Sequence, residues 1–140
     1  MIRKIWKRQE GQSLVEFALV APVLLLVLFG IVEFGLMLYN QHVITNASRE
    51  GARFGIVVES PRRTIAEIQQ VVNDYCGNHL VTFGTTGPPT TTVSYPDGQT
   101  FGKDLHVDVT FHYDFLVLPA FIADFLGGSD LHAHTTMKYE

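Results

Sequence analysis

The stretch EGQSLVEFALVAPVLLLVLFGIVEFG, residues 10–35, decides the fold of this 140-residue chain. No charged residue occurs from Phe17 to Val32, and the wider apolar run from Leu14 to Tyr39 would form a helix of about 39 Å at about 1.5 Å per residue. A bilayer's hydrocarbon core is about 30 Å thick, so this run is long enough to cross it. We therefore predict a single transmembrane helix over residues 12–39.

The charges around this run predict its orientation. Four basic residues precede it, and the first 11 residues carry a net charge of +3: the basic residues are Arg3, Lys4, Lys7 and Arg8, against Glu10. Because Lys and Arg are retained on the cytoplasmic side, we expect a cytoplasmic N-terminus and an extracytoplasmic C-terminal part, anchored in the cytoplasmic membrane. A secretory signal peptide is the alternative, but its apolar region is shorter and ends at a small-x-small site, which this run lacks. Cleavage ahead of the run, at the small residue Gly11, remains open.

The rest of the chain predicts a small α+β domain over residues 40–140, with the N-terminal helix extending to about residue 55. SPRRTIAEIQQVVNDYCG, with Ser60 as the cap, Pro61 in the first turn and Gly77 as the stop, predicts an amphipathic helix. A flexible loop around residues 84–91, a short strand near residues 92–95 and a turn at 96–98 follow. This arrangement is a long helix that continues into an amphipathic helix packed on a short antiparallel sheet.

Strict alternation gives the clearest strand. In LHVDVTFHYDF, residues 105–115, every second side chain is apolar, and DLHAHTTMKY, residues 130–139, alternates again as a final strand. Between them, LVLPAFIADFLGG predicts a short helix or apolar loop. If the two strands pair, their polar faces could bring metal ligands together: His106, Asp108, His112, Asp114, His132 and His134. No spacing among these residues matches a known ligand pattern, so we favour a solvent-exposed sheet face and predict no metal.

Other function classes are disfavoured by composition. The formal net charge is −4, and because the basic leader carries +3, residues 12–140 carry −7, which argues against a nucleic-acid partner. The single cysteine, Cys76, excludes an internal disulfide framework and fits a quiet, half-buried thiol. The sequence has no phosphate-binding glycine loop, nucleophile elbow or HExxH motif. We predict no enzymatic activity and no cofactor.

Several features at the start of the helix occur together and in order. A basic leader ends in Gly11, a glutamate follows at the fifth position after it, an aromatic residue comes next, and NASREGAR ends the extended helix. This pattern resembles the type IV prepilins, and the run from residue 11 to 55 resembles the TadE-like pseudopilins of the tight-adherence (Flp) pilus system. In one respect it departs from the pattern, since Phe17 stands where the best-known systems have tyrosine.

The resemblance implies a pilin-like fold and a structural role. A prepilin peptidase would cut between Gly11 and Gln12, and residues 1–11 would be the leader. Glu16, with Phe17 beside it, would be the assembly residue. Physical reasoning supports this role for Glu16, because a carboxylate near the hydrocarbon boundary normally has a partner, and the new amine on Gln12 would lie one helical turn away. Other partners would be the lipid bilayer, other pilins and the pilus assembly machinery.

Three further features of the helix are candidate contacts. Ala47, Gly51 and Gly55 recur every four residues, so they give one face nearly bare of side chains, on which the protein's own sheet or a neighbouring subunit could pack. Glu33 and the pair Arg49 and Arg53 are candidates for ion pairing. For Glu33, solvation at the far membrane interface is the simpler expectation.

Two functions are therefore weighed. In the first, the chain is a structural pseudopilin or minor pilin, trimmed after Gly11 and required for, or incorporated into, a Tad/Flp pilus used for adherence. In the second, it is an unprocessed single-span protein whose extracytoplasmic domain binds a ligand or senses envelope signals, with the histidine-bearing strand faces as the binding surface.

Overall fold

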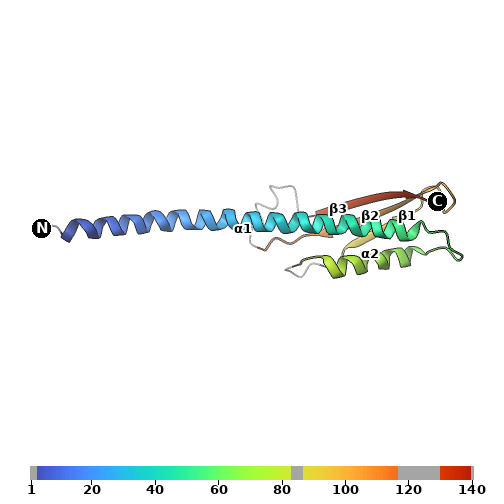
Figure 1. Cartoon of the computed structure of the whole chain (residues 1–140), viewed down its shortest axis with the longest axis horizontal. Coiled ribbons are helices and arrows are strands. Elements are labelled where there is room, and N and C mark those ends of the chain that lie inside the picture. Colours follow the sequence, from blue (N-terminus) through green and yellow to red (C-terminus); the bar gives the residue numbers. More distant parts are fainter. Residues whose placement is uncertain (1–2, 83–86, 117–129, 140) are drawn as a thin grey trace.

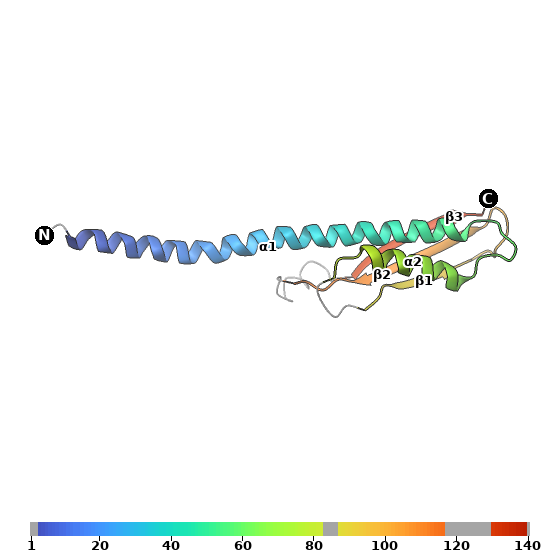
Figure 2. The ribbon, with the colours of Figure 1, turned by 60° about the horizontal axis from the view of Figure 1, so that its bottom comes forward.

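The protein is a long helix with a small domain packed on its C-terminal half, and the architecture is α+β as the sequence predicts (Figure 1). The structure is a computed structural model that describes residues 3–82, 87–116 and 130–139. The first helix, α1, runs without interruption from Arg3 to Gly55 and continues past Pro22. Its N-terminal half projects away from the domain as a single rod in both views (Figure 2).

Three antiparallel strands form one sheet in the order β1-β2-β3. They are β1 (Thr90–Ser94), β2 (Asp104–His112) and β3 (Asp130–Lys138). α1 contacts β2 and β3, and the second helix, α2 (Ile65–His79), contacts α1 and β1. Both helices therefore cover one side of the sheet and leave the other side to solvent.

The alternating pattern in the sequence correctly predicts which strand residues form the core. Leu105, Val107, Val109 and Phe111 of β2 are all buried, and so is Tyr113, which follows the strand. They meet the apolar side of α2, formed by Ile68, Val72 and Cys76. One difference is that β2 ends at His112, so residues 113–115 continue the alternation outside the ladder.

The start and end of α2 differ from the sequence prediction. The helix begins at Ile65 and not at Pro61, because Thr64 caps it: the Thr64 hydroxyl accepts a hydrogen bond from the Glu67 N–H (3.3 Å) and the Glu67 carboxylate accepts one from the Thr64 N–H (2.7 Å). This reciprocal capping box satisfies two N–H groups that the first turn leaves unpaired. At the other end, α2 passes through Gly77 and stops at His79.

The remaining predictions fall on turns and loops. The turn after β1 forms as expected, with the Gly98 N–H bonded to the Tyr95 carbonyl (3.3 Å) and Gly98 at φ +90°, where a glycine is favoured. The short strand begins at Thr90, two residues before the prediction. Residues 84–86 of the predicted loop 84–91 and residues 117–128 of the apolar segment 116–128 lie outside the described residues.

The strand directions place the two ends of the domain. Gln41 contacts the His132 carbonyl and Ser48 contacts Thr135, so β3 runs alongside α1 in the same direction. β2 therefore runs back toward the projecting half of α1 (Figure 2). The chain after β2 reaches Glu33, whose carboxylate accepts a hydrogen bond from the Leu116 N–H. This end of the domain, with Glu33 and Leu116, is called the base below.

Candidate functional site: the exposed helix and its junction with the domain

The N-terminal candidates lie on a fully exposed part of α1. Gly11, Gln12, Glu16 and Phe17 are exposed, and an added Cβ at Gly11 would meet nothing within 4 Å. The Gln12 side-chain amide donates a hydrogen bond to the Glu16 carboxylate (3.3 Å), which places these two residues on one face, a turn apart. The arrangement leaves the Gly11–Gln12 bond accessible and the carboxylate without burial.

Beyond this point the helix surface is almost entirely apolar and exposed. From Leu14 to Val32 the large hydrophobic side chains have exposed fractions from 43% at Phe29 to 72% at Phe17. Among the described residues, one helix, α1, is long and apolar enough to cross a membrane. A surface of this size and composition is unfavourable in water, so lipid or other apolar helices must cover it.

Glu33 occupies a different environment from the solvated interface that we expected. Its side chain is only 3% exposed, and its carboxylate accepts a hydrogen bond from the backbone N–H of Leu116. Burial, and secondly the negative charge of Glu33, raise the pKa of the neighbouring Tyr113. Glu33 therefore holds the chain after β2 against α1.

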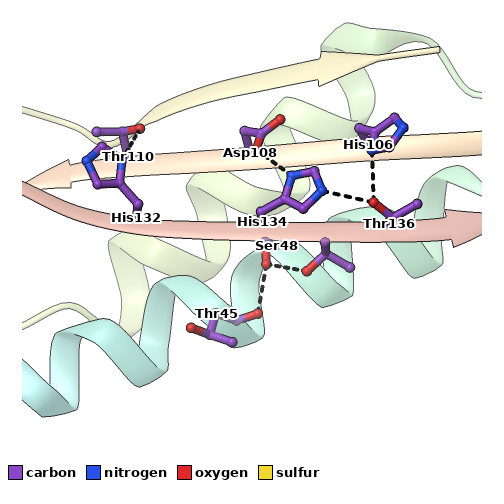
Figure 3. A network of polar contacts seen from close by, with 9 residues as sticks. Thr45, Ser48, His106, Asp108, Thr110, His132, His134 and Thr136 are labelled. Carbon is purple, nitrogen blue, oxygen red and sulfur yellow. Dashed lines mark hydrogen bonds and ion pairs between the residues drawn. The ribbon is translucent and has the colours of Figure 1, made fainter. Parts of the chain in front are cut away.

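Two buried polar residues of α1 were missed in the sequence analysis. Asn40 is fully buried, donates to the Val81 carbonyl (2.8 Å) and accepts from the Val81 N–H (3.0 Å), so it pairs with that peptide as a neighbouring strand would. Ser48, also fully buried, donates to the Thr45 carbonyl (2.9 Å) and lies 2.7 Å from the Thr135 hydroxyl (Figure 3). The available signal was the spacing of Glu33, Asn40 and Ala47, which recur every seven residues on one helix face.

The stripe of small residues lies where the domain packs on α1. Ala47, Gly51 and Gly55 are all buried. An added Cβ at Gly51 would overlap the Val72 side chain of α2, and one at Gly55 would lie 2.6 Å from both Ile68 of α2 and Leu105 of β2. The stripe therefore packs against α2 at Gly51 and against both α2 and the sheet at Gly55. The close approach of α1 and α2 requires glycine at position 51.

Arg49 and Arg53 lie on the opposite side of α1 from this stripe. Both are exposed, and neither makes a salt bridge with any part of the chain that the structure describes. Arg49 also lines a shallow hollow of about 250 Å³ on the helix surface, together with Leu38, Gln41, His42 and Thr45. The two arginines therefore face outward and leave the intramolecular packing to other residues.

The histidine-bearing strands do pair, and their polar side chains form a cross-strand network on the open side of the sheet (Figure 3). His134 lies opposite Asp108 (2.6 Å), His112 opposite Asp130 (2.6 Å), and Thr110 opposite His132 (3.2 Å). Over the described ranges, no group of three or more His, Cys, Asp or Glu side chains is placed to hold a metal ion. Each histidine nitrogen engaged here is bonded to a hydroxyl or carboxylate, so the network is one of cross-strand hydrogen bonds.

Cys76 lies inside the core and not at the surface. It is fully buried on α2, and burial raises the pKa of its thiol to about 11. The thiolate is the reactive form, so this cysteine is unreactive near neutral pH.

Comparison with known proteins adds one match. The family model described as TadE-like protein matches residues 11–53. No match was found among curated proteins or among solved structures. The matched segment begins at Gly11 and ends within the last turn of α1, and it includes Glu16, Glu33, Asn40 and the small-residue stripe up to Gly51. Residues 11–53 therefore match the model of the TadE-like family, which is the family that the sequence pattern of this segment resembles.

Proposed function

We propose that this chain is a pilin-like structural component of a Tad/Flp pilus, held in the cytoplasmic membrane by α1 and made as a precursor that a prepilin peptidase trims after Gly11. The observation that carries the proposal is the closeness of two boundaries: the TadE-like match begins at Gly11, and the apolar run of α1 begins three residues later, at Leu14. A membrane-face protease would find this peptide bond accessible, since neither Gly11 nor Gln12 is covered by the described residues.

Cleavage would change the electrostatics of the exposed helix. Hydrolysis of the Gly11–Gln12 bond leaves a carboxylate on Gly11 and a new α-amino group on Gln12, which is protonated at neutral pH. Glu16 is one turn away on the same face, as the existing Gln12–Glu16 hydrogen bond demonstrates for the side chains. In a medium of low dielectric, an exposed carboxylate needs such a counter-charge, either on its own helix or on that of a neighbouring subunit.

The structural role fits the rest of the molecule. The exposed face of α1 offers apolar packing area to lipid before assembly and to other helices after it. The domain is fixed to the helix through Glu33, Asn40 and Ser48, so helix and domain would move into a filament as one body.

The first test is the trimming itself. When the full chain is co-expressed with a prepilin peptidase, we expect N-terminal sequencing to read Gln12 and intact-mass measurement to give the mass of residues 12–140. Gly11→Leu should abolish this product, whereas Gly30→Ala, at another glycine of α1 with nothing within 4 Å, should leave it unchanged. Recovery of untrimmed chains from the native host would instead support the unprocessed single-span alternative.

The second test separates trimming from assembly. We expect Glu16→Ala to be trimmed like the natural chain but to lower its incorporation into pili about tenfold or more, because loss of an interaction of about 1.4 kcal/mol already changes an equilibrium tenfold. Glu50→Ala is the matched control, since Glu50 is an exposed carboxylate on the same helix but lies within the domain. Incorporation of Glu16→Ala at the level of Glu50→Ala, measured by immunoblot of sheared pili, would contradict the pairing role.

A further inference from the structure

The uncharged segment of α1 is shorter than the hydrocarbon core of a membrane is thick. The 16 residues from Phe17 to Val32 rise about 24 Å, which is about 6 Å less than the hydrocarbon core. If Glu16 remains at one boundary, the core extends about four residues past Val32, to about Leu36. Glu33 then lies at a depth within the hydrocarbon core. Any tilt of the helix moves the edge of the core further along the chain.

The exposed surface of α1 is consistent with this boundary. Phe34 is 45% exposed and Leu38 is 50% exposed, so the apolar outer face continues past Glu33. Glu33 does not interrupt it, because its carboxylate points into the protein and is covered by the chain that follows β2. The protein thereby buries the one charge that would otherwise end the span early.

The residue that covers Glu33 is itself apolar and exposed. Leu116 donates its N–H to the Glu33 carboxylate, while its side chain is 60% exposed. Phe115 beside it packs partly on the core and meets the Tyr113 ring edge-on, with ring centroids 5.4 Å apart. These two contacts fix the corner formed by Phe115 and Leu116 beside Glu33 on α1.

The polar groups nearby lie on the domain side of this corner. Asp114 precedes Leu116 by two residues, and it lies beside His112 (3.5 Å), which is paired with Asp130. At about 3.3 Å per residue of extended chain, Asp114 is about 7 Å from Leu116 toward the domain. That distance puts the carboxylates at the headgroups when Leu116 is at the hydrocarbon boundary.

We propose that the corner Phe115–Leu116 is a second membrane-contacting surface of this protein, which inserts at the lipid hydrocarbon boundary beside α1 and is positioned there by Glu33. The inference rests on α1 spanning the bilayer, but it does not depend on the orientation of the span or on cleavage after Gly11. Its consequence is that the base of the domain is docked on the membrane surface.

The experiment measures where position 116 lies relative to lipid. Single cysteines are introduced in the full chain as Leu116→Cys, Phe101→Cys and Val27→Cys, labelled with a nitroxide and reconstituted in phosphatidylcholine nanodiscs. Phe101 is the matched control, because it is an 81% exposed apolar residue in the β1–β2 loop at the opposite end of the domain. Val27 reports the span, and the unsubstituted chain, taken through the same labelling, controls for the buried Cys76.

Lipid exposure raises the collision rate of the nitroxide with oxygen, and water exposure raises it with a soluble nickel chelate. We expect position 116 to favour oxygen, as position 27 does, and position 101 to favour nickel. Adding Glu33→Ala to the Leu116→Cys chain should shift position 116 toward nickel and leave position 27 of the corresponding double variant unchanged.

Each other outcome overturns the proposal in a recognisable way. A nickel preference at 116 with an oxygen preference at 27 means that the span exists but the base stays in water. Low collision rates with both reagents at 116 mean that the corner is covered by protein. A nickel preference at 27 removes the span itself and with it the basis of the inference, and an unchanged signal at 116 in the Glu33→Ala chain removes the positioning role of Glu33.

Discussion

Gly51→Val is expected to destabilise the folded domain by about 3 kcal/mol or more, which is a large share of the stability of a small domain. At this position α1 and α2 approach so closely that even a Cβ would overlap Val72. Val72 is fully buried and β-branched, so it has little rotameric freedom with which to move away. Valine at position 51 adds two further methyl groups to the same space, and the helices must separate to accommodate them.

The comparison that makes this prediction specific uses alanine at two glycines. Gly51→Ala should cost about 1–2 kcal/mol, because the overlap outweighs the gain of up to about 1 kcal/mol in helix propensity. Gly77→Ala should be neutral or stabilising, since Gly77 lies within α2 with nothing within 4 Å of its added Cβ. Thermal unfolding of the full chain in detergent, followed by circular dichroism, measures all three variants. A Gly51→Ala chain as stable as the Gly77→Ala chain would show that the helices do not pack this closely.

Asn40→Ala is expected to cost about 2–3 kcal/mol through the loss of a hydrogen-bonded pair in the core. The Asn40 amide satisfies both the N–H and the carbonyl of Val81, and its removal leaves two backbone groups without their partners. Asn40→Asp should cost more, because a carboxylate cannot donate to the Val81 carbonyl and its charge would lie in a fully buried position. The segment after α2 would then be released from α1.

A matched control for this prediction lies on the same helix. Asn46 is exposed, so Asn46→Ala should change the free energy of unfolding by no more than about 0.5 kcal/mol. Hydrogen exchange gives a second readout, because the Val81 amide should lose protection in Asn40→Ala while amides of β2 keep theirs at temperatures well below unfolding. Equal protection of Val81 in the Asn40→Ala and Asn46→Ala chains would refute the pairing.

Much of the fold can be predicted from local patterns. The apolar run gives the projecting half of α1, and the strict alternation of residues 105–113 gives both the existence of β2 and its buried face. These features can be predicted because each depends on a repeat within one element: 3.6 residues for a helix and two for a strand. The start of α2 was misjudged because Ser60 and Pro61 offer a cap by composition, whereas the capping box of Thr64 with Glu67 is made by reciprocal hydrogen bonds.

The sequence by itself determined that the chain has a long exposed apolar helix, a glycine and a glutamate at the start of that helix, and a half-buried sheet after it. Only the tertiary structure decided what Glu33, Asn40 and Ser48 do, since their partners are backbone or hydroxyl groups of Leu116, Val81 and Thr135, far away in the sequence. A polar residue in an apolar helix has the same sequence signature whether it meets water, lipid headgroups or a distant peptide group. Which of these it meets depends on the folding of the rest of the chain around it.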